Sequence, residues 1–129
     1  MIVVDTSALM AILLNEPSAE ECKLAIVEDG DLVISAGTIA EALIVSARRN
    51  VGDEMSRLIE GLGFEIMDVT RGEAHRVAAA YERWGKGVPP AALNFGDCFA
   101  YAAARERNCP LLYVGEDFAR TDIQPALSR

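Results

Sequence analysis

The sequence predicts an α/β protein with a central, mostly parallel sheet of four to five strands flanked by helices. Short apolar runs that suit buried strands alternate along the chain with segments whose apolar residues recur at helical spacing. Parallel strands require long crossover connections, and each predicted helix can supply one. The length of 129 residues suits one core, so we predict a single domain spanning residues 1–129.

The first strand and the first helix are predicted at the N-terminus. Ile2–Val4 is a continuous apolar run, as expected for a buried strand. Asp5, Thr6 and Ser7 follow it, and side chains of these types cap the N-termini of helices. The sequence therefore predicts a strand-to-helix junction, with a helix over residues 8–14.

The middle of the chain repeats this alternation. Pro17 ends the first helix, and a second helix is expected from residue 19 until Gly30. Leu32–Ser35 is the second predicted strand, and Gly63 precedes a third strand at residues 64–69. The helices between these two strands are expected at residues 37–49 and 53–62.

The last part of the chain holds two further helices and the fourth strand. Arg71–Trp84 has the apolar spacing of an amphipathic helix. Its inward face is expected to consist of Ala74, Val77, Ala78 and Tyr81. Residues 85–90 contain two glycines and two prolines, which indicates an exposed loop. A helix at 96–108 and a strand at 111–114 follow.

The composition bears on the partners and the location of the protein. A net charge of −8 is unusual for a nucleic-acid binder, because Lys and Arg normally supply the affinity for phosphate. The apolar stretches are far shorter than the ~20 residues that span a bilayer, and no signal-peptide pattern is present. The three cysteines lack the spacing of a zinc site. We therefore expect a cytoplasmic protein with reduced thiols and no membrane association.

Four carboxylates occupy positions where a charge is costly or where ligands usually bind. Asp5 and Asp117 follow predicted strands, and ligands of parallel sheets bind beyond the carboxyl ends of the strands. Glu41 and Asp97 are surrounded in sequence by apolar residues, so their burial needs a compensating charge. No Lys or Arg is close to Asp97 in sequence, and a hard divalent cation such as Mg²⁺ would supply that charge.

Each of these residues also has a structural explanation. Asp5 could serve only as a helix cap, and Asp117 only as a turn residue. A single carboxylate of this kind is more often structural than catalytic. The occurrence of four together favours a metal site.

Four segments carry a resemblance to a known family. They are Val4-Asp5-Thr6-Ser7-Ala8-Leu9, the helix containing Glu41, Leu93-Asn94-Phe95-Gly96-Asp97, and the run from Leu112 to Ile123. In this order, and over nearly the whole chain, they resemble the motifs of PIN-domain VapC toxins. The resemblance implies a PIN-like domain that acts as a metal-dependent endoribonuclease.

The resemblance also assigns the site. It implies that Asp5, Glu41, Asp97 and Asp117 are the catalytic and metal-binding carboxylates, with Asp5 and Asp97 as direct ligands and the other two binding directly or through water. Mg²⁺ is the implied cofactor, with Mn²⁺ as a substitute. The supporting residues would be Thr6, Ser7 and Asn94. The family often has Asn or Asp at the position of Glu116, and we favour Asp117 as the residue of this pair that faces the metal.

The implied substrate is RNA, in a structured form such as tRNA or rRNA. Metal would activate a water for hydrolysis of a phosphodiester bond. A mechanism based on two histidines is disfavoured, because the sequence contains only His75. Arg83 and Lys86, on one helix and the loop after it, are candidate phosphate contacts, although a solvated helix face explains them equally well.

The resemblance further implies partners. Family members usually form homodimers and are inhibited by a VapB-like antitoxin whose C-terminal segment enters the acidic groove. Because such antitoxins typically carry a DNA-binding domain, contact with DNA would be indirect.

Rival functions fit less well. A receiver domain needs a lysine after its last core strand, and a phosphatase with an aspartate nucleophile needs a second Asp where Ser7 lies. No glycine-rich dinucleotide fingerprint follows the first strand. The alternative that stays open is a PIN-like module that has lost catalysis and only binds or regulates a partner.

Overall fold

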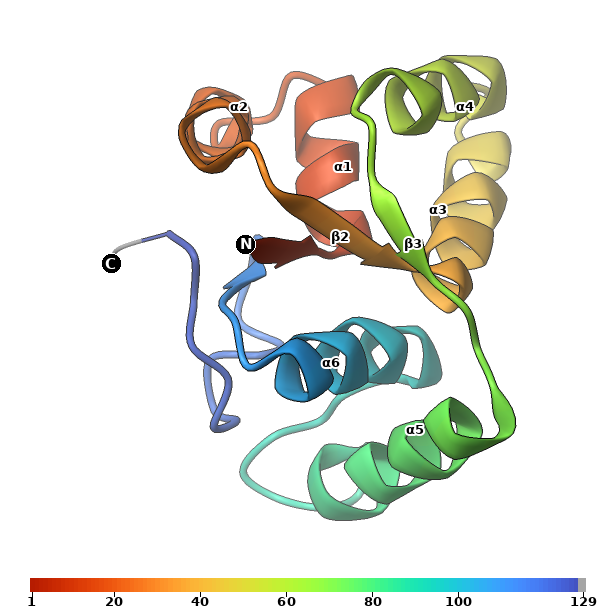
Figure 1. Ribbon diagram of the computed structural model, residues 1–129, viewed down its shortest axis with the longest axis vertical. Coiled ribbons are helices and arrows are strands. Elements are labelled where there is room, and N and C mark those ends of the chain that lie inside the picture. Colours follow the sequence, from red (N-terminus) through yellow and green to blue (C-terminus); the bar gives the residue numbers. More distant parts are fainter. Residues whose placement is uncertain (128–129) are drawn as a thin grey trace.

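The computed structural model describes residues 1–127 and contains, within that range, one sheet of four parallel strands (Figure 1). The strands are β1 (Ile2–Val4), β2 (Leu32–Ser35), β3 (Glu65–Met67) and β4 (Leu111–Leu112). Their order is β3-β2-β1-β4, so β1 and β2 lie inside the sheet. The predicted parallel α/β fold is confirmed, and the carboxyl ends of all four strands point to one edge.

Helices cover both faces of the sheet (Figure 1). One face carries α1 (Thr6–Leu13), α2 (Ala19–Asp29) and α4 (Gly52–Gly61), and the other carries α6 (Phe95–Arg107), with α5 (Arg71–Trp84) packed on α6. The remaining helix, α3 (Ala36–Arg48), contacts α1, α4 and α6. This position of α3 brings it next to the N-terminus of α6.

The strand residues alternate between two apolar clusters. Val3 and Val33 belong to the cluster under α5 and α6, whereas Ile2, Val4 and Ile34 belong to the cluster under α1, α2 and α4. Successive side chains of a strand point to opposite faces, so a sheet covered on both sides needs apolar residues at every position. This requirement explains the continuous apolar runs in the sequence.

Strand β3 is shorter than predicted, at residues 65–67 instead of 64–69, and two further boundaries differ close to Asp5. Helix α1 begins at Thr6 rather than at residue 8, since Asp5 itself is the N-cap. Strand β4 ends at Leu112 rather than at residue 114, and the backbone N–H of Val114 donates to Ser7 Oγ at 2.9 Å. The chain therefore leaves the sheet at this point to contact the first turn of α1.

The residues predicted to form the inward face of α5 are mostly exposed, so this prediction is largely wrong. Only Val77 of the four expected residues is buried, and the helix packs through Glu73, Val77 and Ala80. Tyr81 is 39% exposed. Because α5 packs mainly on α6, a narrow stripe at positions i, i+4 and i+7 is enough to attach it.

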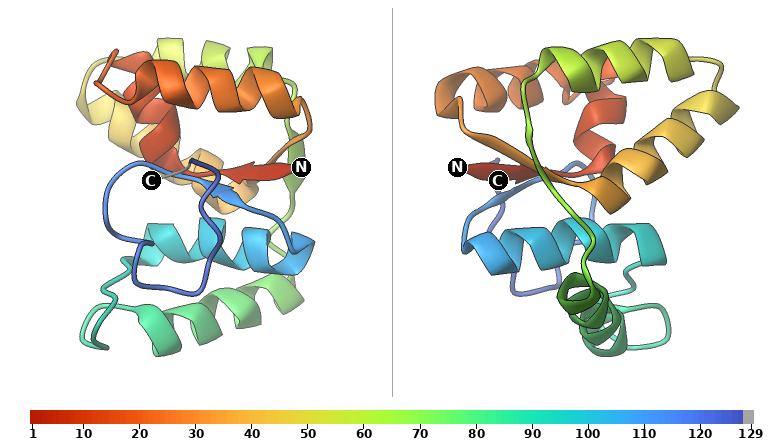
Figure 2. Two further views of the ribbon diagram at one scale, coloured as in Figure 1. Left: turned by 90° about the vertical axis from the view of Figure 1, so that its left-hand side faces the viewer. Right: turned by 45° about the vertical axis from the view of Figure 1, so that its right-hand side comes forward.

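The segment after β4 returns across α6 toward α5 (Figure 2). Phe118 and Ile123 anchor it in the core, and the N–H of Leu111 donates to the carbonyl of Gln124. None of the helices within residues 1–127 is long and apolar enough to cross a membrane.

Candidate active site

Asp5 lies directly after β1 and is almost completely buried, with 2% of its surface exposed. Its Oδ2 atom caps α1 by accepting hydrogen bonds from the backbone N–H of Ser7 at 3.0 Å and from Ser7 Oγ at 2.7 Å. Its Oδ1 atom is buried and has no hydrogen-bond partner among residues 1–127. The pKa of Asp5 is raised to about 6, mainly by burial and in smaller part by the charge of Glu41, against the lowering effect of the hydrogen bonds from Ser7. Burial thus outweighs the hydrogen bonds that favour the ionised carboxylate.

Ser7 connects three parts of the site. Its hydroxyl donates to Asp5 and accepts the hydrogen bond from the N–H of Val114. The Ser7 side chain thereby holds the segment that leads to Asp117 against the N-terminus of α1. This role supports the prediction that Ser7 assists the site.

Glu41 reaches the same edge of the sheet from α3. Its Oε1 atom accepts a hydrogen bond from Thr6 Oγ1 at 2.6 Å. Its carboxylate also lies against the backbone of Gly96, where a Cβ atom would overlap Oε2. The observed position of the Glu41 carboxylate therefore depends on the absence of a side chain at Gly96. Sequence reasoning missed this role of Gly96, because no local pattern distinguishes it from other glycines.

Asp97 is held at the N-terminus of α6 by a capping box with Asn94. The N–H of Asp97 donates to Asn94 Oδ1 at 2.8 Å, and the N–H of Asn94 donates to Asp97 Oδ2 at 3.0 Å. The pKa of Asp97 is raised to about 7, mainly by burial, with contributions from the charges of Asp5, Asp117 and Glu41 and an opposing one from the hydrogen bond of the Asn94 N–H. The four predicted carboxylates are therefore close enough to act on one another.

Asp117 differs from the other three because it is exposed. It lies in the irregular segment after β4, five residues beyond the last strand residue. Its charge is one of the three that raise the pKa of Asp97. That interaction favours Asp117 as the fourth member of the group.

The chemistry of these donors fits a hard divalent cation. Within residues 1–127, no Lys or Arg forms an ion pair with any of the four carboxylates. In the same part of the chain, no three potential ligands are already drawn together at ligand distance. Mg²⁺ usually keeps several waters and binds through one or two carboxylates, so it does not require three direct protein ligands.

The two predicted phosphate contacts lie outside this acidic group. Arg83 forms an ion pair with Asp122 and stacks on the ring of Trp84. Lys86 is exposed in the loop after α5. The structure adds Arg105, which the sequence did not single out, to the surroundings of Arg83.

The fold and the site together define an α/β domain with an acidic centre at the carboxyl edge of its sheet. The PIN-domain family model matches residues 2–124. Ribonuclease VapC30 of Mycobacterium tuberculosis is 40% identical over 124 residues, which cover 94% of this chain and 95% of that protein. The VapC ribonuclease of Mycolicibacterium smegmatis is 39% identical over 124 residues, which cover 94% of this chain and 96% of that protein.

A solved structure supports the same fold. VapC20 of M. tuberculosis, described as a toxin that cleaves the sarcin-ricin loop, aligns with a TM-score of 0.79 at 15% identity, covering 95% of this chain and 96% of that chain. The family model and the two relatives show that the chain belongs to the PIN-domain family, and within it to the VapC ribonucleases.

Proposed function

We propose that this chain is the toxin of a toxin-antitoxin pair and hydrolyses RNA with the help of a divalent metal. The observation that carries the proposal is the buried, unpartnered Oδ1 of Asp5 within a group of four carboxylates that no Lys or Arg of residues 1–127 neutralises. An ionised carboxylate in such a place requires a cation. The relatives named as ribonucleases support RNA as the substrate.

The proposed metal is Mg²⁺, with Mn²⁺ as a substitute. Asp5 and Asp97 would bind it directly, and Glu41 and Asp117 would bind it directly or through water. When bound, the metal lowers the pKa of a water and stabilises the charge on the leaving oxygen.

The side chains around these carboxylates fix their positions. Through hydrogen bonds, Thr6 orients Glu41, Ser7 orients Asp5, and Asn94 orients Asp97. A preorganised site of this kind avoids reorganisation during the reaction. We propose a structured RNA such as tRNA or rRNA as the substrate, in line with the activity stated for VapC20, and we propose Arg83 and Lys86 as contacts to its phosphates.

The proposed partners are a VapB-like antitoxin and a second copy of the chain. A structure of VapBC2 from Rickettsia felis bound to promoter DNA has the same fold, with a TM-score of 0.68 at 18% identity, covering 97% of this chain and 96% of that chain. By analogy, contact with DNA would occur through the antitoxin. We place the complex in the cytoplasm.

The proposed dimer has a suitable surface. Ile44 of α3 and Phe95 of α6 are 59% and 66% exposed and line one hollow beside Glu41. Large apolar side chains in such a patch are typical of a protein interface. Sedimentation of the wild type and of Ile44→Glu tests this surface, and a monomeric wild type would contradict the dimer.

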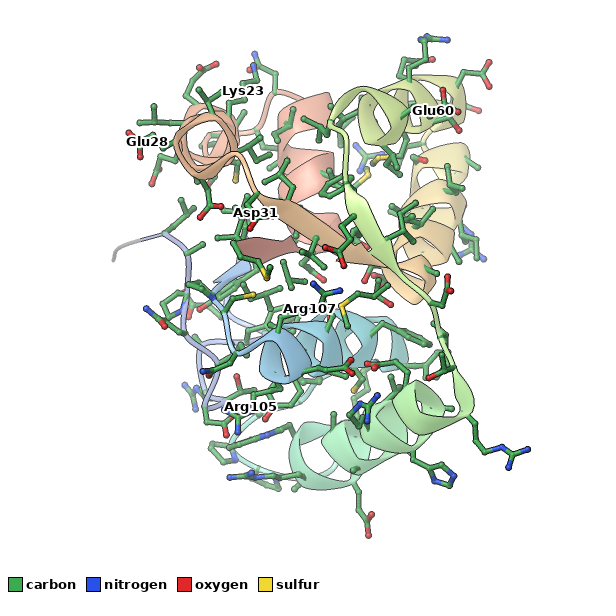
Figure 3. The ribbon with its side chains drawn as sticks, in the orientation of Figure 1. Lys23, Glu28, Asp31, Glu60, Arg105 and Arg107 are labelled. Carbon is green, nitrogen blue, oxygen red and sulfur yellow. The ribbon has the colours of Figure 1, made fainter. Side chains whose placement is uncertain are left out.

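The main experiment is cleavage of a cellular RNA pool by the purified, antitoxin-free chain, with sites mapped. We expect cleavage with Mg²⁺ or Mn²⁺, and we expect its loss with chelator, in Asp5→Asn and in Asp97→Asn. Glu60→Gln on α4 (Figure 3) removes the same charge from an exposed position and should cleave normally. If the folded wild type cleaves nothing, the inactive binding module becomes the better explanation.

A further inference from the structure

A groove between α5 and α6 carries three arginines in a chain whose net charge is −8. Small residues of the two helices form its floor, and arginines surround it. The residues that line this arginine groove are Arg76, Ala79, Ala80, Arg83, Trp84, Tyr101, Ala102 and Arg105. A concentration of guanidinium groups on an acidic protein is a candidate site for an anion.

Arg83 and Arg105 share a single counter-charge. A nitrogen of each lies 3.8 Å from Oδ2 of Asp122, which is longer than the 2.7–2.9 Å typical of a charge-assisted hydrogen bond. The two side chains are 63% and 55% exposed. Asp122 also accepts a hydrogen bond from the hydroxyl of Tyr101 at 2.5 Å. Within residues 1–127, two guanidinium groups pair with one carboxylate, which leaves one positive charge uncompensated and several N–H donors unused.

Arg76 contributes less to this site. It forms ion pairs with Glu73 and Glu106 at 3.2 and 3.1 Å, so two carboxylates already compensate its charge. The part of the groove that can bind an anion is therefore formed by Arg83 and Arg105.

The groove lies along the same helix as the acidic centre. Asp97, Tyr101 and Arg105 are spaced four residues apart on α6, so Arg105 is about 12 Å along the axis from Asp97 at 1.5 Å per residue. This length corresponds to roughly three to four nucleotides of a stacked strand at 3.4 Å each. Figure 3 shows Arg105 near the C-terminal segment, which also connects Asp117 to Asp122.

We infer that Arg83 and Arg105 form a second RNA site, which binds a backbone phosphate a few nucleotides away from the scissile bond. The inference rests on the proposed function and adds to it the means by which an acidic chain holds its substrate. Asp122 keeps the two guanidinium groups together when RNA is absent. An incoming phosphate shares these donors with Asp122, and the bidentate geometry of arginine suits it.

The chain contains one tryptophan, Trp84, and this residue lines the groove. Its ring lies 4.6 Å from the guanidinium carbon of Arg83. Its fluorescence therefore reports on the site independently of cleavage. We would titrate Asp97→Asn, which should not cleave, with a single-stranded RNA 12-mer. We expect the RNA to change the fluorescence of Trp84 in a saturable manner.

The decisive variant is Arg83→Gln with Arg105→Gln in the Asp97→Asn background. We expect RNA affinity to fall about tenfold, and the slope of log affinity against log salt to become shallower by about 0.7, the value for one phosphate of a single strand that the variant no longer neutralises. The matched control is Arg49→Gln with Arg57→Gln, which removes the same charge from exposed positions at the end of α3 and within α4. Equal losses in both double variants would overturn the inference, because only net charge would then matter.

The variant Asp122→Asn tests whether Arg83 and Arg105 bind RNA or have only a structural role. Removing the shared counter-charge while keeping an acceptor for Tyr101 should strengthen RNA binding several-fold. If Arg83 and Arg105 only fasten the C-terminal segment, the same change should leave affinity unchanged or weaken it, which would contradict the inference. A response of Trp84 to poly-glutamate equal to that to RNA would also contradict it.

Activity measurements distinguish this inference from the proposed function. In the otherwise wild-type chain, the Arg83→Gln and Arg105→Gln pair should raise KM about tenfold and leave kcat unchanged. If the wild type cleaves RNA but the double variant has an unchanged KM, the second RNA site is refuted and the proposed function is not. A wild type that binds RNA through Trp84 but never cleaves it would overturn the proposed function and leave the second site in place.

Discussion

The hydroxyl of Thr6 donates a hydrogen bond of 2.6 Å to Glu41, which joins the first turn of α1 to α3 beside the buried Asp5. Thr6 is itself buried, with 7% of its surface exposed. The two elements that it connects are separated by β2 and α2 in the sequence. This contact determines where the Glu41 carboxylate lies relative to Asp5.

Thr6→Val should lower kcat/KM by about ten- to a hundredfold, because a hydrogen bond to a charged group contributes about 1.5–3 kcal/mol. Thr6→Ser keeps the hydroxyl and should retain most activity. Steady-state cleavage of one mapped RNA site measures both. Equal activity of the valine and serine variants would show that this hydrogen bond does not position Glu41.

Gly96→Ala should reduce activity more than an ordinary substitution at an exposed helix start. The added Cβ would overlap the carboxylate of Glu41, so Glu41 must move or α6 must shift away from α3. We expect a loss of at least about a hundredfold in kcat/KM, as for a misplaced catalytic group. Gly61→Ala in α4 meets no neighbouring atom within 4 Å and serves as the control. Normal activity of Gly96→Ala would contradict the arrangement of Glu41.

The metal-free protein should be more stable at pH 5 than at pH 8. The pKa of Asp5 is raised from 3.8 to about 6 and that of Asp97 to about 7, so the folded chain binds more protons than the unfolded chain between about pH 4 and 7. Stability therefore falls as the pH rises through these values. The rise for Asp5 alone corresponds to about 3 kcal/mol at 1.36 kcal/mol per pH unit.

Thermal unfolding in chelator at the two pH values checks this direction. The pKa values of Asp29 and Glu65 are lowered. These two groups therefore change stability only below about pH 5, and they do not oppose the expected loss of stability between pH 5 and pH 8. Saturating Mg²⁺ should stabilise the protein mainly at pH 8, because the metal needs ionised carboxylates. A metal-free Tm that rises from pH 5 to pH 8 would contradict the burial of uncompensated charge.

Asp5→Asn should raise the Tm of the metal-free protein at pH 8 by several degrees while abolishing cleavage. Asn caps helices as well as Asp does, and the substitution removes a buried charge whose Oδ1 has no partner. Added Mg²⁺ should then stabilise the wild type more than the variant. A lower Tm for Asp5→Asn in chelator would mean that the carboxylate is compensated without metal.

The pattern of residues predicted the elements well where local chemistry determines them. Ile2–Val4 and Leu32–Ser35 are strands because a sheet covered on both faces demands unbroken apolar runs. Asp5 was predictable as a candidate site residue because it follows such a strand and precedes a helix. The predicted end of β4 was wrong. The N–H of Val114 donates to the hydroxyl of Ser7, which is far away in the sequence, and not to a neighbouring strand.

Local patterns in the chain were enough to predict the parallel α/β fold, the family and the four carboxylates, since periodicity, capping residues and motif order can be read residue by residue. Other features became visible only in the folded chain: the unpartnered oxygen of Asp5, the space that Gly96 leaves for Glu41, and the proximity of Arg105 to Arg83. Each of these features depends on packing between elements distant in sequence. Such contacts arise from how helices meet across the sheet, and no local pattern encodes them.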